Sequence, residues 1–220
     1  MIETTEQTAG RPDTKERILD AAERLFAEHG FQGASLRQIT AEAQVNLAAV
    51  NYHFHSKEAL LTAVIQRRME PVNVERLARL DELEKAAGDA PIPLEALVRA
   101  LLEPMFRQAE TVGPLARLMG RIFSDPEAST RQLMFPAIKQ TVERFRPVFL
   151  RALPGDHDGK IFLGIFFGFG AAAHYMLAGN LLNLIAPGEG PFQNPGWVVD
   201  NLVQYVCAGL RALTKQEVRQ

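Results

Sequence analysis

Cysteine is nearly absent from this chain of 220 residues, in which Cys207 is the only one. Disulfide frameworks and cysteine-rich zinc or iron–sulfur sites need several cysteines in one chain, so the sequence excludes both. We expect Cys207 to be a small buried hydrophobic residue, with a redox sensor as the less favoured alternative. The five histidines show no ligand spacing with carboxylates, and we therefore predict no metal site and no cofactor.

A net charge of one sign is also lacking. The chain carries 24 Lys and Arg against 26 Asp and Glu, a formal charge of −2. Residues 1–70 hold 8 basic and 10 acidic side chains, and residues 71–220 hold 16 of each. Whole-chain electrostatics therefore predicts no attraction to phosphates, and any contact with nucleic acid must come from a local motif.

Signatures of catalytic sites are missing as well. The chain contains no Walker-type phosphate loop, no Gly-x-Ser-x-Gly nucleophile turn and no His-Glu-x-x-His zinc motif. An enzyme is therefore the function class that the sequence supports least, and we predict that the protein is not one.

Long hydrophobic runs are limited to Ile161–Gly179, which has 19 residues without a formal charge and is long enough to span a membrane. His174 and four glycines interrupt this run, and no basic flank or aromatic belt sets an orientation. We favour a helix buried at a subunit interface of a soluble protein, and a small helical membrane protein is the alternative. Residues 1–12 are polar and match no targeting peptide, so we expect a disordered tail on a cytoplasmic protein.

Residues that start and end helices are abundant in the chain. No stretch shows sustained alternation of β-branched and polar residues, so we predict an all-α fold of about nine helices. The expected caps are Asp13 with Glu16, Ser35 with Gln38, Asn46, Ser56, Asp125, Asn194 and, at a C-terminus, Gly30. The predicted helices cover residues 14–29, 35–43, 47–53, 57–85 with a bend at Pro71, 93–108, 114–123, 126–153, 158–184 and 195–213. After the tail we expect two domains, 13–70 and 71–220.

The pattern that points to a function lies in residues 31–61. Two short helices joined by residues 43–45 have the spacing of a helix-turn-helix, about residues 36–55, whose second helix enters the major groove of DNA. Small side chains at the front of that helix allow close approach to base edges, and Asn51 can bond adenine through two hydrogen bonds. Phosphate contacts come from basic and aromatic side chains and from the start of the next helix. Candidate DNA contacts are Arg37, Gln38, Asn46, Leu47, Ala48, Ala49, Asn51, Tyr52, His53 and Lys57.

Two alternatives to DNA contact remain open in this segment. Arg37 could be an ordinary solvated residue rather than a phosphate contact. Phe54 fits core packing beneath the first helix, whereas Tyr52 and His53 cannot both point inward from consecutive helical positions. We therefore expect at least one of that pair to face outward.

This segment resembles the tetracycline-repressor (TetR) family of transcriptional regulators. The likeness rests on Ile18, Ala21-Ala22, Leu25-Phe26, Gly30-Phe31, Ser35-Leu36-Arg37-Gln38-Ile39, Ala43, Val45, Val50, Tyr52-His53-Phe54 and Lys57-Glu58-Ala59-Leu60. Spacing and residue types match together over four helices. The family usually has glycine where this chain has Gln44, which costs about 1 kcal/mol if that residue is left-handed. The resemblance implies a repressor whose larger helical half binds a small molecule and thereby releases DNA.

A dimer is the expected form, because one helix-turn-helix contacts too little DNA for specificity. Residues 161–184 are too apolar for the outer helix of a monomer, and small residues such as Gly164 and Gly168 permit close helix packing. We expect this helix and the last one to pair across a two-fold axis, an arrangement that the family resemblance also implies. The expected DNA partner is then an inverted-repeat operator.

The larger half concentrates Phe and Met, which suits either an ordinary core or a roomy apolar pocket. The chain is similar to the fatty-acid-responsive members of the family over residues 45–54 and 117–124. That similarity suggests a long-chain fatty acid or acyl-CoA effector with its head near Arg121 or His174. An aromatic or drug-like effector is the alternative, and an ion pair for Arg121 or an interface position for His174 remains open. The candidate pocket residues are Met105, Phe106, Met119, Arg121, Phe123, Phe166, Phe167, His174 and Met176.

Overall fold

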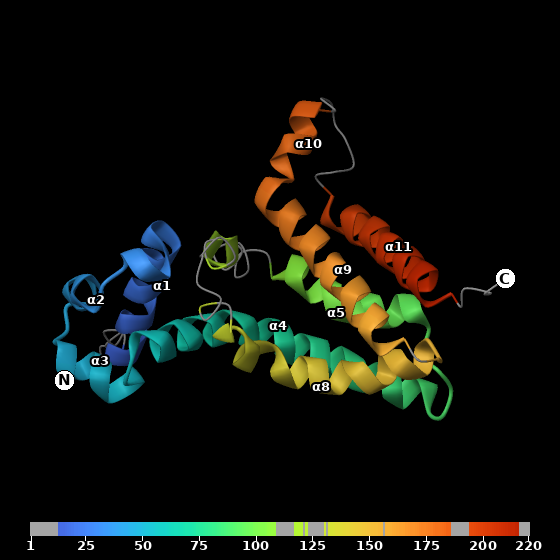
Figure 1. Ribbon diagram of the computed structural model, residues 1–220, viewed down its shortest axis with the longest axis horizontal. Coiled ribbons are helices and arrows are strands. Elements are labelled where there is room, and N and C mark those ends of the chain that lie inside the picture. Colours follow the sequence, from blue (N-terminus) through green and yellow to red (C-terminus); the bar gives the residue numbers. More distant parts are fainter. Residues whose placement is uncertain are drawn as a thin grey trace, which may run out of the picture. The chain divides into compact units, whose positions relative to one another are not determined.

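The computed structural model describes residues 13–108, 117–120, 122, 130, 132–155, 157–185 and 194–215. In these residues it has nine helices and no strand (Figure 1), which confirms the predicted all-α fold. The predicted tail over residues 1–12 and the predicted cap at Asp125 lie outside the described residues. Of the predicted helix 114–123, the described residues 117–120 and 122 are helical.

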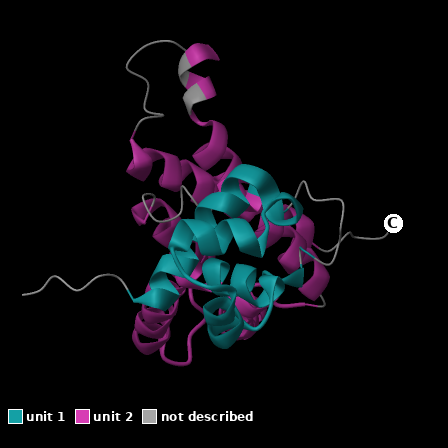
Figure 2. Ribbon diagram, turned by 90° about the vertical axis from the view of Figure 1, so that its left-hand side faces the viewer, with its two compact units in different colours: residues 1–65, 120–134 teal, residues 66–119, 135–220 magenta. Residues whose placement is uncertain are grey.

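The first of two compact units contains residues 1–65 and 120–134 (Figure 2). Its described helices are α1 (Thr14–Gly33), α2 (Leu36–Ala43), α3 (Leu47–Phe54) and the first turns of α4 (Lys57–Ala87). α1 packs against α2 and α3, and α2 packs against α3. Buried apolar side chains in these helices include Ile18, Leu19, Ala22, Phe26, Ile39, Val50, Phe54, Leu60, Leu61 and Val64.

Side-chain caps define the starts of α2, α3 and α4. Ser35 donates its N–H to Oε1 of Gln38 at 2.8 Å, and Gln38 donates its N–H to Oγ of Ser35 at 3.2 Å. The side chains of Asn46 and Ser56 each accept the backbone N–H three residues ahead, at 2.9 and 3.1 Å. The capping residues predicted for these three helices are therefore confirmed.

The capping box predicted at Asp13 is wrong. Asp13 stands directly before α1, but its side chain makes no capping hydrogen bond. Its φ is −52°, whereas the capping residues Ser35 and Asn46 have φ of −106° and −87°. The more extended φ places a capping oxygen near the free N–H groups of the first turn. Suitable residue types are thus present at Asp13 without the required backbone conformation.

Gly30 interrupts α1 where the sequence predicts the helix to end, with φ 74° and ψ 172°. One further helical turn follows, so the helix extends to Gly33 rather than stopping at His29. The interruption turns Phe31 into the interior, where its ring centroid lies 5.8 Å from that of Phe26. A side chain at Gly30 would be strained by the positive φ.

The second compact unit contains residues 66–119 and 135–220. It holds the rest of α4 together with α5 (Leu94–Arg107), α8 (Phe135–Ala152), α9 (Asp158–Ala178), α10 (Asn180–Ile185) and α11 (Pro195–Thr214). α11 packs against α9 and α5, and α8 contacts both α5 and α9 (Figure 1). The core includes Leu80, Leu97, Val98, Leu101, Leu102, Phe106, Phe145, Phe149, Ile161, Ala172, Val203, Val206 and Leu210.

Two predicted helices are interrupted in the structure. Within the helix predicted over 126–153, the described residues 130 and 132 are helical, a turn follows at residues 133–134, and α8 then begins at Phe135, where Pro136 suits the first turn of a new helix because it has no N–H to give. The helix predicted over 158–184 ends at Ala178. Gly179 donates its N–H to the carbonyl of Tyr175 at 2.7 Å, and the separate α10 follows.

Cys207 lies on α11 with 1% of its surface exposed, as the sequence predicts. Burial raises the pKa of its thiol to about 11, Glu95 adds to the rise, and Arg211 opposes it. Reactive cysteines are accessible and have lowered pKa values, so the structure gives no support to the redox alternative.

α9 has two faces. Toward α11, Gly164 and Gly168 leave room for Leu210 and Val206, so these glycines serve helix packing within the chain. Elsewhere α9 is the one helix in the described part of the chain that is long and apolar enough to cross a membrane, and 22% of its apolar stretch is buried. Its exposed apolar side chains are Phe162, Leu163, Phe166, Phe167 and Leu177.

We predict that Gly168→Ala lowers the free energy of unfolding by about 1–2 kcal/mol, measured by urea titration. A Cβ at Gly168 would lie 2.9 Å from Cγ2 of Val206, a stiff β-branched side chain. Gly159→Ala is the matched control, because nothing lies within 4 Å of a Cβ at that position of the same helix. Equal stability of the two variants would contradict close packing of α9 on α11.

Candidate nucleic-acid interface

The turn between α2 and α3 has the backbone of a helix-turn-helix. Gln44 follows α2 in the left-handed conformation, with φ 53° and ψ 48°. Its N–H donates to the carbonyl of Ala41 at 3.2 Å, and the N–H of Val45 donates to that of Thr40 at 3.0 Å. Arg17 of α1 donates to the carbonyl of Gln44 at 3.5 Å. These bonds hold the turn so that α3 leaves it in one direction.

α3 is anchored on one side and open on the other. Val50 and Phe54 are buried, with 0% and 4% of their surfaces exposed. Tyr52 is 80% exposed, and Asn51 is exposed beside it. Phe54 is therefore a core residue, and Tyr52 faces outward, as the sequence analysis expects.

The other predicted DNA contacts on α3 show a graded exposure. Leu47 and Ala48 are exposed, while Ala49 and His53 are half-buried. The His53 and Tyr52 rings meet edge to face with centroids 5.1 Å apart. This contact orders the exposed Tyr52 ring at the end of α3, because edge-to-face packing is the favoured geometry for such rings.

Two of the predicted DNA-contacting residues, Gln38 and Asn46, also cap helices. Oε1 of Gln38 accepts hydrogen bonds from Ser35, and Oδ1 of Asn46 accepts from Ala49. Both side chains are exposed, and their amide NH₂ groups are donors that the caps do not use. Each can therefore cap a helix and still donate to an acceptor such as a phosphate oxygen.

Lys57 is half-buried at the start of α4, with Nζ 4.5 Å from the centroid of the Phe31 ring. Burial lowers the pKa of its ammonium group, and the nearby Glu58 partly opposes this. The cation–π contact limits where the ammonium can lie. Sequence reasoning did not identify this role of Phe31, because the ring is adjacent to Lys57 only in the folded unit.

Basic charge that remains available in the first unit is sparse. Arg24 is paired with Glu42 on α2. Arg37 is exposed on α2, and its side chain forms no hydrogen bond or ion pair with the described part of the chain. Arg37 and Lys57 are thus the candidates for phosphate contact beside α3, and Lys15 at the start of α1 is exposed as well.

The predicted pocket residues are dispersed in the second unit. Phe166 and Phe167 are 65% and 53% exposed on α9, and His174 is also exposed. Phe106 is buried, and Met105, Met119 and Met176 are half-buried. The predicted Arg121 and Phe123 lie outside the described residues.

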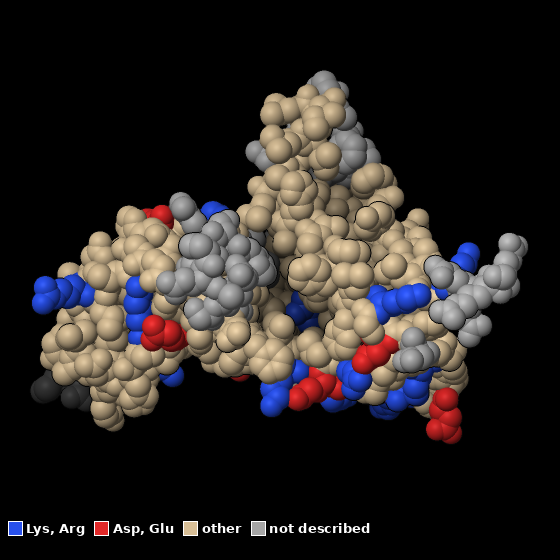
Figure 3. Space-filling view, viewed as in Figure 1, with Lys and Arg blue, Asp and Glu red and all other residues tan. Residues whose placement is uncertain are grey.

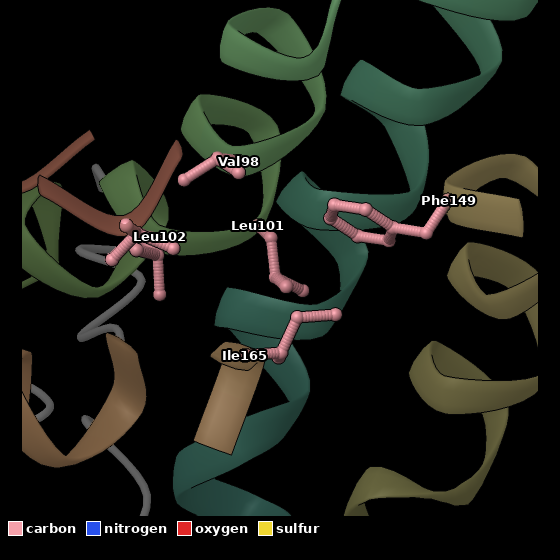
Figure 4. Close-up of a pocket in the computed structure, with 6 residues that line it drawn as sticks. Val98, Leu101, Leu102, Phe149 and Ile165 are labelled. Carbon is pink, nitrogen blue, oxygen red and sulfur yellow. The ribbon is translucent and has the colours of Figure 1, made fainter. Parts of the chain in front are cut away.

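A hollow in this unit has other walls. It lies between α5, α8, α9 and α11, is apolar, and leaves no room for a water molecule. Its lining residues are Val98, Leu101, Leu102, Phe149, Ile165 and Val206 (Figure 4). None of the seven predicted pocket residues that the structure describes lines this hollow. In the described part of the chain no group of three or more His, Cys, Asp or Glu is placed to hold a metal ion.

Family models match both units of the chain. Residues 18–64 match the model described as bacterial regulatory proteins, tetR family. Residues 95–209 match the model described as tetracyclin repressor-like, C-terminal domain, which by itself covers more than half of the chain.

Curated relatives agree with these models over part of their length. The chain is 33% identical over 113 residues to the HTH-type transcriptional regulator UidR of Escherichia coli, which is 51% of this chain and 55% of that protein. It is 26% identical over 137 residues to the repressor KstR of Rhodococcus jostii, 55% of this chain and 65% of that one. The chain thus spans little more than half the length of the curated relatives it matches.

Solved structures share the fold at low sequence identity. The fatty acid degradation regulator FadR from Bacillus halodurans is 17% identical with a TM-score of 0.54, covering 96% of this chain and 99% of that one. The hemolysin II transcriptional regulator HlyIIR is 20% identical with a TM-score of 0.54, covering 89% and 98%.

We predict that Gln44→Gly raises the free energy of unfolding by about 0.5–1 kcal/mol, because glycine adopts the left-handed conformation without a Cβ clash. Gln44→Ala is the control, since it removes the same side chain but keeps the Cβ. Chemical denaturation of both variants gives the comparison. If the alanine variant is as stable as the glycine variant, backbone strain at this turn is not the cause.

Proposed function

The chain belongs to the TetR family of bacterial transcriptional regulators, and we propose that it binds an inverted-repeat operator as a homodimer and releases it when a small apolar effector binds. Repression in the bacterial cytoplasm is the proposed mode of action. The observation that carries the proposal is α3, whose buried Val50 and Phe54 leave Asn51 and Tyr52 exposed.

The chemistry of this exposed face suits base and phosphate contacts. Leu47 and Ala48 are small or apolar enough to approach base edges and thymine methyl groups, and Asn51 can read adenine. Tyr52, Arg37 and Lys57 then supply donors for phosphates on either side. Since the first unit is not strongly basic, specificity depends on shape and hydrogen bonding more than on bulk charge.

The homodimer is supported by the apolar surface of the last helices. Exposed large apolar side chains there are Phe162, Leu163, Phe166, Phe167, Leu177, Leu181, Leu184, Ile185, Trp197 and Tyr205. Contiguous apolar surfaces of this kind mark interaction sites in proteins. A second copy of the same surface would cover it across a two-fold axis, with α9 and α11 contributed by each subunit. A subunit contact at this surface would also account for the many apolar side chains that α9 exposes in a single chain.

A fatty acid or acyl-CoA is the effector class that we propose. The side chains that line the hollow between α5, α8, α9 and α11 are aliphatic and aromatic, as those around an acyl chain would be, and they would have to move apart to admit one. Some structures with this fold are described as regulators of fatty acid metabolism, among them FadR from Bacillus halodurans and a candidate regulator from Clostridium perfringens.

The operator proposal is tested by selecting binding sites from random duplexes with the purified protein. We expect an inverted repeat, and we expect Asn51→Ala to relax the preference at one base step in each half-site by about 1–3 kcal/mol. Lys57→Ala should weaken binding to all duplexes alike and reduce its salt dependence, because it removes a phosphate contact. Lys85→Ala, an exposed change at the far end of α4, is the control.

Two outcomes would overturn this assignment of α3. One is a selection that yields no inverted repeat. The other is an Asn51→Ala variant that binds every duplex more weakly by the same factor, as a phosphate contact would.

The dimer proposal predicts that Phe166→Glu weakens self-association by about tenfold or more, since it buries a charge in an apolar contact. Sedimentation equilibrium of the purified protein measures the change. Val74→Glu is the matched control, because Val74 is an exposed apolar residue on α4 and not part of the proposed surface on the last helices. Equal association of both variants would place the subunit contact elsewhere.

A further inference from the structure

A charged side chain lies in the core of the second unit, and among the residues that the structure describes it has no partner of opposite charge. Arg76 on α4 exposes 2% of its surface. Its Nε donates to the carbonyl of Leu101 at 2.8 Å, and its Nη1 donates to Oδ1 of Asn73 at 3.0 Å. Nη2 is buried with no hydrogen-bond partner anywhere in the described part of the chain. Both acceptors are neutral, so the charge of the guanidinium is not compensated.

Two carboxylates on α4 and α5, those of Glu75 and Glu103, are held by other basic residues. Arg79 contacts Glu103 at 2.7 Å and Glu75 at 2.9 Å, and Arg107 contacts Glu75 at 3.4 Å. The fold therefore places two acidic side chains beside α4 and α5 and pairs neither with Arg76. A buried cation left unpaired costs several kcal/mol of stability, so its presence calls for a physical reason.

The surroundings of Arg76 offer little other compensation. Its Cζ lies 5.2 Å from the centroid of the Phe169 ring on α9. This cation–π contact offsets part of the lost hydration but leaves the free N–H bonds of Nη2 unused. Burial lowers the pKa of the Arg76 guanidinium to about 10, so it stays protonated at neutral pH.

Arg76 and the apolar hollow have a neighbour in common. Leu101 lines the hollow and also supplies the carbonyl that accepts from Arg76. Ile165, whose side chain points toward Leu101 in Figure 4, is one helical turn before Phe169. In the space-filling view, basic atoms are visible on the floor of a recess where α4, α5 and α9 come together (Figure 3). The cation and the hollow therefore lie on either side of Leu101.

We propose that Arg76 anchors the carboxylate of an amphipathic effector whose hydrocarbon tail occupies the hollow after the lining side chains of Leu101, Phe149 and Ile165 move apart to admit it. The free Nη2 offers donors only, which an acceptor-only carboxylate complements in charge and in hydrogen bonding. This inference rests on the proposed function and narrows it to the free acid. A thioester lacks the negative charge at that position, and the nucleotide of a coenzyme would require many more donors than one buried guanidinium.

The binding test uses decanoate and 1-decanol as probes of equal chain length, titrated calorimetrically into the full-length protein without DNA. We expect decanoate to bind at least about tenfold more tightly than 1-decanol, because only the acid pairs with the guanidinium. Arg76→Met should bind the two probes alike. Arg99→Met is the control, since Arg99 lies on α5 with its charge exposed and paired to Asp200, and it should keep the preference for the acid.

A second readout applies to the unmodified protein and does not depend on whether Arg76→Met folds. The ¹³C resonance of bound [1-¹³C]decanoate reports the pKa of its carboxyl group. A neighbouring guanidinium favours the ionised form, so the pKa of the bound acid should lie below that of free decanoate. A raised pKa would show that the head lies in apolar surroundings away from Arg76.

The remaining outcomes decide against the proposal. If decanoate does not bind, or binds Arg76→Met with the same preference over 1-decanol, then Arg76 holds only ordered water. Operator binding is measured separately on the same samples. A protein that selects operator DNA but ignores decanoate disproves this inference alone, whereas one that binds decanoate through Arg76 but no DNA disproves the proposed function.

Discussion

The whole exposed face of α3 depends on the burial of Val50 and Phe54, four residues apart on one side of a short helix. An eight-residue helix is not stable by itself in water, so its position is set by these two contacts and by the capped ends. The Asn46 cap and the left-handed Gln44 orient the helix, and the buried pair keeps it from rotating. Asn51 and Tyr52 are presented to solvent as a consequence.

Local chemistry made most of this fold predictable from the sequence. Ser35, Asn46 and Ser56 cap their helices as predicted, because a cap depends on residues within one turn. Two predictions were wrong, the continuation of the helix past Gly179 and the capping box at Asp13. Both depend on backbone conformations that residue types alone do not specify. The prediction of caps is therefore more secure than the prediction of where long helices end.

The two candidate sites also differ in how far the sequence predicts them. α3 could be predicted because a helix-turn-helix is a local pattern. Side-chain type was a poor guide to the apolar region, since Phe166 and Phe167 lie on the surface and Leu101 and Ile165 line the hollow. Arg76 gave no signal in the sequence, because nothing local distinguishes this fully buried arginine from the half-buried Arg67, Arg68 and Arg79 on the same helix. Only packing of α4 against α5 and α9 reveals it.

The solitary thiol of Cys207 has a practical consequence for watching the protein move. It is sealed beneath the surface of α11, and its raised pKa keeps it protonated. A maleimide or disulfide reagent can reach it only when the last helix lifts from its neighbours, so the rate of covalent labelling counts such openings. The labelling rate of the native Cys207 therefore reports how often α11 opens, and no probe has to be introduced.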